Sequence, residues 1–64
     1  MNNPTVANYF ELDNLGIKKV IRLGKNEFGF NEKIIELNDG TQYDFIPEDN
    51  LYEKRSSKYQ VEIN

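Results

Sequence analysis

The stretch Lys33-Ile34-Ile35-Glu36-Leu37-Asn38-Asp39-Gly40-Thr41-Gln42-Tyr43-Asp44-Phe45-Ile46-Pro47 decides the fold, because it predicts two β-strands joined by a tight turn and ended by a proline. Two loop lengths fit it. A two-residue loop at Asp39-Gly40 would mix apolar and polar residues on both faces of the hairpin. A three-residue loop, 38–40, separates them and pairs Leu37 with Thr41, Ile35 with Tyr43, and Lys33 with Phe45.

With the three-residue loop the hairpin has one apolar face, made of Ile35, Leu37, Tyr43 and Phe45. The other face is mixed and carries Glu32, Ile34, Glu36, Gln42, Asp44 and Ile46. A slip of one residue would exchange the faces, so burial selects this register. A three-residue loop ends in the left-handed region, where glycine avoids a Cβ clash. We therefore predict a positive φ at Gly40.

The flanking sequence predicts further short elements. Asn3-Pro4 before the apolar residues and Gly16 after them favour a short helix in residues 1–16. The alternative for this segment is a strand with Val6, Phe10 and Leu12 on one face. Residues 17–23 predict a strand with Ile17, Ile21 and Leu23 inward and with Lys18, Val20 and Arg22 outward.

After the hairpin, residues 47–51 predict one helical turn that begins at the proline, and residues 53–57 predict a polar connection. Residues 58–63 alternate and predict the last strand, with Tyr59, Val61 and Ile63 inward. About five short strands without a long helix indicate a mainly β fold, a small barrel over residues 17–63 after the N-terminal segment. The 64 residues predict one domain, 1–64.

The order of these elements resembles the SH3-like barrels, including their KOW-type domains in small bacterial and phage proteins. The resemblance lies in the Phe28-Gly29 loop, the Asp39-Gly40 turn and the segment Phe45–Leu51, where a proline-led turn precedes the last strand. KOW motifs carry a second glycine where this chain has Asn31-Glu32, and peptide-binding SH3 domains use a tryptophan that this chain lacks. The resemblance therefore implies a fold, and carries over no ligand.

Charge is unevenly distributed along the chain, whose net charge is −3. Residues 25–53 hold two lysines against eight carboxylates. We expect these carboxylates to form an acidic surface around an apolar centre, which is typical of a protein-binding site that steers toward a basic partner. This hypothesis places the site at Ile34, Glu36, Asp44, Ile46, Glu48 and Asp49. It describes a non-catalytic protein-binding module, such as a phage or mobile-element accessory protein that inhibits a basic host protein.

Two alternatives remain open from the sequence. One is a KOW-like domain that binds nucleic acid or a ribonucleoprotein through Lys18, Lys19, Arg22, Lys54, Arg55 and Lys58. The isoelectric point of about 4.8 argues against it, because phosphate binding usually accompanies an elevated value. The other alternative is a structural subunit that assembles with copies of itself. The same acidic residues also suit a solvated surface that only keeps the domain soluble.

The side chains of most catalytic sites are missing. The chain has no histidine and no cysteine, so the common general base and the usual metal ligands are absent, and neither a disulfide nor a thiolate site is expected. Ser56 and Ser57 lie in a charged segment without a base nearby in sequence. We expect a protein that is not an enzyme and needs no cofactor or metal. Without a signal peptide or a long apolar run, we expect it in the cytoplasm and not in a membrane.

Overall fold

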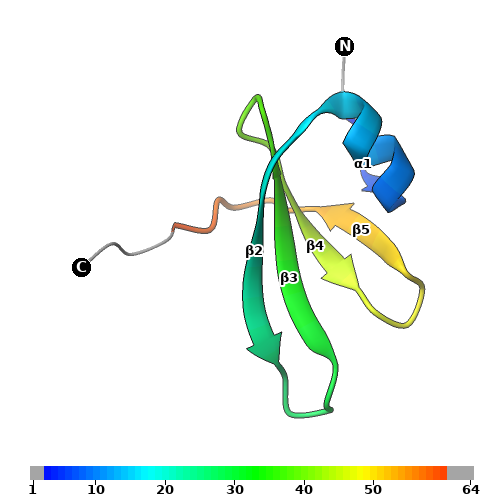
Figure 1. Cartoon of the computed structure of the whole chain (residues 1–64), viewed down its shortest axis with the longest axis vertical. Helices are drawn as coiled ribbons and strands as arrows, with labels where there is room; N and C mark the ends of the chain where they lie inside the picture. Colours follow the sequence, from blue (N-terminus) through cyan, green and yellow to red (C-terminus); the bar gives the residue numbers. More distant parts are fainter. Residues whose placement is uncertain (1–2, 61–64) are drawn as a thin grey trace.

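The computed structural model describes residues 3–60, which form one five-stranded antiparallel sheet with a single short helix (Figure 1). The elements in chain order are β1 (Val6–Ala7), α1 (Tyr9–Leu15), β2 (Ile17–Lys25), β3 (Asn31–Leu37), β4 (Gln42–Ile46) and β5 (Leu51–Lys54). In the sheet the strands lie in the order β1-β5-β4-β3-β2. The predicted mainly β fold of about five short strands with a short N-terminal helix is confirmed.

The β3–β4 hairpin has the predicted register. Ile35 pairs with Tyr43, and the Leu37 amide donates to the Thr41 carbonyl at 2.8 Å. Gly40 has φ +91°, as a three-residue loop requires. Asp39 stabilises the same turn, because its Oδ1 accepts from the Thr41 amide at 2.9 Å. This hydrogen bond is the main reason why the pKa of Asp39 is lowered from 3.8 to about 2.

We expect Gly40→Val to destabilise the protein by about 1–2 kcal/mol, the usual cost of holding a β-branched residue in the left-handed region. Space is not the cause, since a Cβ at this position would lie 3.6 Å from Lys58 Nζ, an ordinary contact. Urea denaturation measures the change. Gly40→Asn is the matched control and should lose less, because asparagine tolerates positive φ. Equal stability of wild type and Gly40→Val would contradict the register.

The helix begins later than predicted. Its N-cap is Asn8 and not Asn3: the Asn8 side chain accepts from the Glu11 amide at 2.8 Å, and the Glu11 carboxylate accepts from the Asn8 amide at 3.0 Å. This reciprocal pair is a capping box, and the spacing of the two residues predicts one. The predicted end is confirmed, because Gly16 closes the helix with φ +100°. A Cβ there would also lie 2.6 Å from the Asn38 side-chain nitrogen.

The core lies between α1 and one end of the sheet. We call the side of the sheet that faces α1 the inner face and the opposite side the outer face. Leu12 is the buried residue of the helix, and it packs with Ala7, Ile35, Leu37, Tyr43 and Tyr52. The N-terminal segment is fastened beside this core, because the Tyr43 hydroxyl donates to the Pro4 carbonyl and Asn3 Nδ2 donates to Thr41 Oγ1 at 2.8 Å.

The predicted facing of β2 is wrong beyond Lys18, because the ladder with β3 shifts register between Ile17 and Lys19. An extra residue in one strand moves the later side chains to the opposite face. Val20 pairs with Ile35 and packs against the core, while Ile21 pairs with Ile34 on the outer face. Arg22 therefore lies on the inner face. A second shift between Arg22 and Gly24 accompanies the exposure of Leu23.

The last strand is also earlier than predicted. The Pro47 turn is present, since the Asp49 amide donates to Ile46 and the Asn50 amide to Pro47, but Leu51 already belongs to β5. Residues 51–54 pair with β4 on one side and with β1 on the other. Residues 55–60, which include half of the predicted final strand, are not in a strand. Val61 and Ile63 of that prediction lie outside the described residues.

The described strands form an open sheet, because β1 and β2 lie at its two edges and do not pair with each other. The strand pairing in the described residues therefore does not show the predicted closure of the sheet into a barrel. In the described part of the chain, no helix is long and apolar enough to cross a membrane.

Candidate functional site

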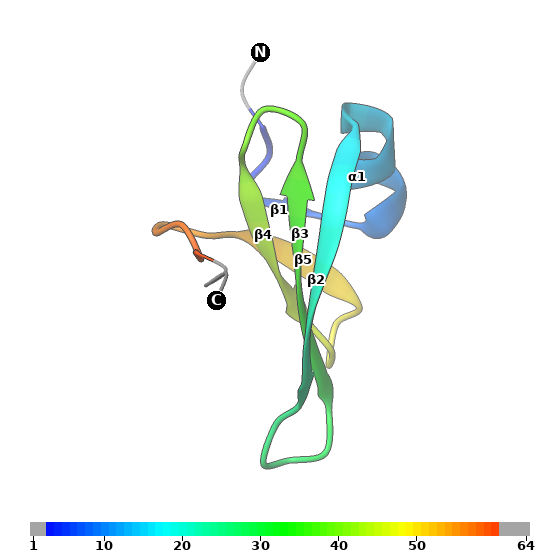
Figure 2. The same ribbon diagram turned by 60° about the vertical axis from the view of Figure 1, so that its left-hand side comes forward.

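The outer face of the sheet is covered at one end by residues 55–60, which we call the C-terminal arm; Figure 2 shows the arm and α1 on opposite sides of the sheet. Gln42 holds the arm: its Oε1 accepts from the Tyr59 amide at 2.6 Å, and its Nε2 donates to the Tyr59 carbonyl at 3.1 Å. The Arg55 amide donates to the Gln42 carbonyl at 2.9 Å. The face that the sequence predicts to be open is therefore closed at this end.

The predicted acidic docking face does not form as one surface. Ile34 is fully buried and Glu36 is 6% exposed, so neither can meet a partner. Asp44 is half-exposed and is paired with the Arg55 guanidinium. Ile46 is partly buried, and of the six residues only Glu48 and Asp49, in the turn after β4, are exposed. Alternation along the strands could not reveal this, because the arm that pairs with Gln42 follows β5 in the chain.

Glu36 is satisfied inside the protein. It accepts a hydrogen bond from Gln42 Nε2 at 2.8 Å and lies 3.8 Å from Lys18 Nζ. The Gln42 hydrogen bond, helped by the charges of Lys19, Lys18 and Lys58, lowers the pKa of Glu36 despite the opposing effect of burial. Lys18, Lys19 and Lys58, which the nucleic-acid alternative assigns to phosphate binding, thus act on the Glu36 carboxylate.

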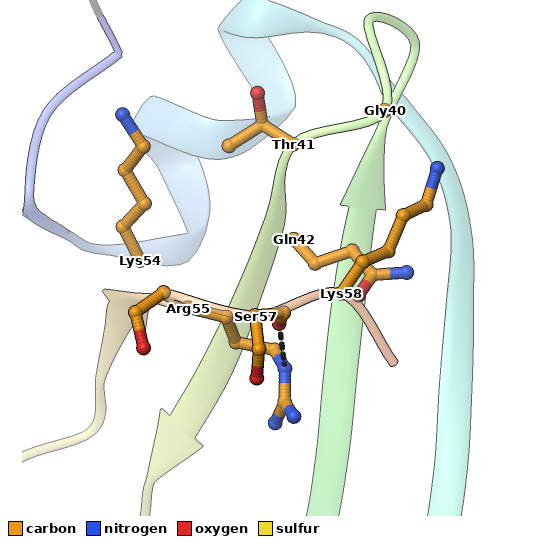
Figure 3. Close-up of a pocket in the computed structure, with 8 residues that line it drawn as sticks. Gly40, Thr41, Gln42, Lys54, Arg55, Ser57 and Lys58 are labelled. Carbon is orange, nitrogen blue, oxygen red and sulfur yellow. Dashed lines mark hydrogen bonds between the residues drawn. The ribbon is translucent and has the colours of Figure 1, made fainter. Parts of the chain in front are cut away.

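Lys54, Arg55 and Lys58 of the same predicted set line a surface pocket of about 240 Å³ beside the 38–41 turn (Figure 3). Their charges diverge. Lys58 extends past Gly40, Lys54 extends along the other side of Thr41, and the Arg55 guanidinium turns away, with Nε donating to the Ser57 carbonyl at 3.1 Å. Arg22, the sixth member of the set, lies on the inner face. The structure therefore does not bring these six cations together on one phosphate-binding surface.

The inner face is covered only at one end. In Figure 1, α1 lies over the end of the sheet near the 38–41 turn, and the ends of β2 and β3 near residues 26–30 extend beyond it. A groove of about 320 Å³ lies on this part of the sheet. We call it the basic groove; its lining residues are Arg22, Gly24, Asn31, Glu32, Lys33 and Phe45.

Aromatic rings continue the basic groove toward the helix. Lys33 Nζ lies 4.6 Å from the centroid of the Phe45 ring and 5.8 Å from that of Tyr52. The Phe45 and Tyr52 centroids are 5.0 Å apart, and Tyr52 is 6.3 Å from Tyr9 of the helix. An ammonium over aromatic rings is favourable. The sequence predicts the pairing of Lys33 with Phe45, which indicates this contact, but it predicts no strand at Tyr52.

Charge separates between the two faces of the sheet. Residues that pair across an antiparallel ladder point to the same face, so the pairings assign the strand positions of β2–β5 except Lys18 and Leu23, which lie at the register shifts of β2. In β2–β5 the charged residues at inner positions are all cations, namely Arg22, Lys25, Lys33 and Lys54. Outer positions hold Glu32, Glu36, Asp44 and Glu53 against Lys19. Two ion pairs occur in residues 3–60, Lys18–Glu36 and Arg55–Asp44, and neither involves an inner-face cation.

Comparisons with known proteins assign no family to this chain: no family model, no curated protein and no solved structure matches it. Among residues 3–60, no group of three or more acidic side chains is placed to hold a metal ion.

Proposed function

We propose that this chain is a non-catalytic protein-binding module whose basic groove holds an acidic segment of another protein. The observation that carries the proposal is the separation of charge: the inner positions of β2–β5 hold cations and no carboxylate. At the uncovered end of the inner face, Arg22 and Lys33 line the basic groove beside Phe45, and one carboxylate, that of Glu32 from an outer position, lines it with them. Cations beside apolar rings supply both steering and buried area to an anionic partner. The partner's charge is opposite to the one that the sequence suggests.

A peptide fits the basic groove better than a nucleic acid does. Bases bind by stacking on a free aromatic face. Phe45 offers no such face, because Lys33 Nζ lies over its ring and Tyr52 packs against it with centroids 5.0 Å apart. A net charge of −3 repels every anion, and it repels a nucleic acid more strongly than a short acidic segment because each nucleotide adds a phosphate charge. A short acidic segment needs only the few cations that the groove presents.

The SH3-like barrel stays part of this proposal as the fold type. It is supported by the consecutive antiparallel pairing of β2, β3, β4 and β5 through tight turns. An inhibitor that occupies a host protein's surface is one role that such a module serves. The acidic turn residues Glu48 and Asp49 lie in the connection between β4 and β5 and are not part of the basic groove.

The test measures binding of a peptide that repeats Glu-Val five times, by calorimetry at an ionic strength of about 0.01 M, where screening is weak. We expect R22Q/K33Q to weaken binding by about tenfold or more, because it removes two charges that contact the peptide. K54Q/K58Q is the matched control: it changes net charge equally, and although Lys54 is at an inner position, both lysines line the pocket of Figure 3 and neither lines the basic groove. We expect it to bind almost as wild type does.

Three results would overturn the proposal. The first is equal binding by wild type and R22Q/K33Q. The second is a larger loss in K54Q/K58Q, which would place the site at the pocket beside the 38–41 turn. The third is a preference for a ten-nucleotide thymidine strand over the Glu-Val peptide, which would favour the nucleic-acid alternative. Thermal melts of both variants verify that each remains folded.

A further inference from the structure

We infer that the acidic segment binds as an added strand along the free edge of β2, with alternate side chains entering the basic groove. This inference rests on the proposed function and specifies how the partner is held. β2 has nine residues and lies at the edge of the sheet, with β3 on one side (Figure 1). Within residues 3–60 no strand pairs with its other side. An extended segment that joins such an edge gains main-chain hydrogen bonds.

The hydrogen-bond pattern identifies the free backbone groups. Along an antiparallel strand, successive residues direct their N–H and C=O groups to opposite neighbours. Leu37 bonds to Thr41 of β4, and the Asn38 amide bonds to the Gly16 carbonyl on the β2 side. Because the direction alternates along β3, Ile35 and Lys33, which lie two and four residues before Leu37, also direct their N–H and C=O groups toward β4. Their partners in β2 are Val20 and Arg22.

Val20 and Arg22 therefore direct their own N–H and C=O groups away from β3, toward the free edge. The ladder is regular from Lys19 to Arg22, between the two register shifts. The side chains of Val20 and Arg22 lie on the inner face, and Arg22 lines the basic groove. A strand that bonds to these two residues must then place two of its own side chains on the same face, next to the groove.

The charge of β2 selects the kind of strand that can join it. β2 carries Lys18, Lys19, Arg22 and Lys25 and no acidic residue, although the whole chain has net charge −3. Lysines on an edge strand commonly protect against aggregation. Here they also exclude a second copy of this chain, because two β2 strands side by side would oppose eight cations without a carboxylate. An acidic strand would instead place carboxylates beside these cations. The charges of β2 therefore repel a second copy of this chain and attract an acidic segment.

The four regular positions specify a partner pattern. An acidic residue of the added strand forms a favourable cross-strand pair with Arg22 or Lys19. An apolar residue forms a favourable pair with Ile21 or Val20. The pattern is acidic, apolar, apolar, acidic. We use the capped peptide Thr-Glu-Val-Val-Glu-Thr as the probe, and its analogue with glutamine in place of both glutamates as the charge control.

N-methylation of the peptide backbone tests strand addition without changing any charge. One analogue carries N-methyl groups on the first Glu and the second Val, which face Arg22 and Val20 in the antiparallel arrangement. The other carries them on the first Val and the second Glu, whose amides point away from β2. We expect the first analogue to bind about tenfold more weakly than the parent peptide and the second to bind almost as well as the parent. Only the first analogue lacks the amide donors that bond to the edge of β2.

The outcomes separate this inference from the proposed function. If both methylated peptides bind as well as the parent, and the glutamine peptide binds weakly, the partner lies in the groove without joining β2: the inference fails and the proposed function stands. If Thr-Glu-Val-Val-Glu-Thr and the repeated Glu-Val peptide both fail to bind, both fail. A concentration-dependent dimer that protects β2 amides from hydrogen exchange would show a second copy on the edge and would also overturn the inference.

Discussion

Replacing Leu12 with alanine is expected to destabilise the protein by about 2–5 kcal/mol, the range for removing a fully buried leucine side chain. Leu12 is 0% exposed and is the buried residue of α1 in the core cluster, which it forms with residues of β3, β4 and β5. A domain of this size is stable by only a few kcal/mol. We therefore expect a large fraction of Leu12→Ala to be unfolded at 25 °C.

Urea denaturation followed by circular dichroism measures this loss. Phe10→Ala is the matched control: it shortens a larger side chain on the same helix, but Phe10 is 71% exposed. We expect its free energy of unfolding to stay within about 0.5 kcal/mol of wild type. Similar losses in the two variants would mean that α1 does not pack on the sheet through Leu12.

Replacing Ile34 with alanine is expected to cost about 2–5 kcal/mol as well. From the sequence, Ile34 is the apolar centre of an exposed docking face, and an exposed residue can be shortened with little effect on folding. In the structure its side chain is 0% exposed on the outer face, next to Ile21 across the ladder. The expected loss is therefore of stability and not of binding, so the variant distinguishes the two interpretations directly.

Leu23→Ala is the control for Ile34→Ala. Leu23 lies in the strand beside Ile34 and is 41% exposed at a register shift of β2. We expect a cost of about 1 kcal/mol or less, since much of its side chain is already in water. If Ile34→Ala melts like wild type while its binding of the acidic peptide falls, Ile34 is a surface anchor, and the closure of the outer face by the C-terminal arm is wrong.

Local chemistry explains what the sequence could predict. The β3–β4 register follows from Gly40 and from the alternation of Ile35 and Leu37, since a one-residue slip would expose both. The end of the helix follows from Gly16 in the same way. Its start was also encoded locally, in the spacing of Asn8 and Glu11, but Pro4 supplied a competing signal.

The structure differs from the sequence prediction where segments distant in the chain decide the local conformation. The first register shift of β2 has no local signal, and it moves Val20 and Arg22 to the inner face. Residues 51–54, Leu-Tyr-Glu-Lys, do not alternate between apolar and polar side chains, and they become a strand because β4 and β1 bond to both sides of them. The C-terminal arm closes the outer face through Gln42, which lies 17 residues from Tyr59 in the chain.

The candidate site differs from the sequence prediction for the same reason. The sequence predicts an open outer face and therefore a binding site at its acidic residues. The pairings instead assign cations to the inner positions and most carboxylates to the outer positions. The contact of Lys33 with Phe45 was within reach of the sequence, because the predicted register already placed the two residues opposite each other.

An NMR titration tests the central claim, that the uncovered end of the inner face is the binding surface. ¹⁵N-labelled protein is titrated with the repeated Glu-Val peptide at low salt. We predict that the largest shift changes fall on Arg22, Lys33 and Phe45 and that they diminish as salt is added, since the contact is between opposite charges. Shift changes confined to Glu48, Asp49 and the C-terminal arm, with the basic groove unaffected, would contradict the account.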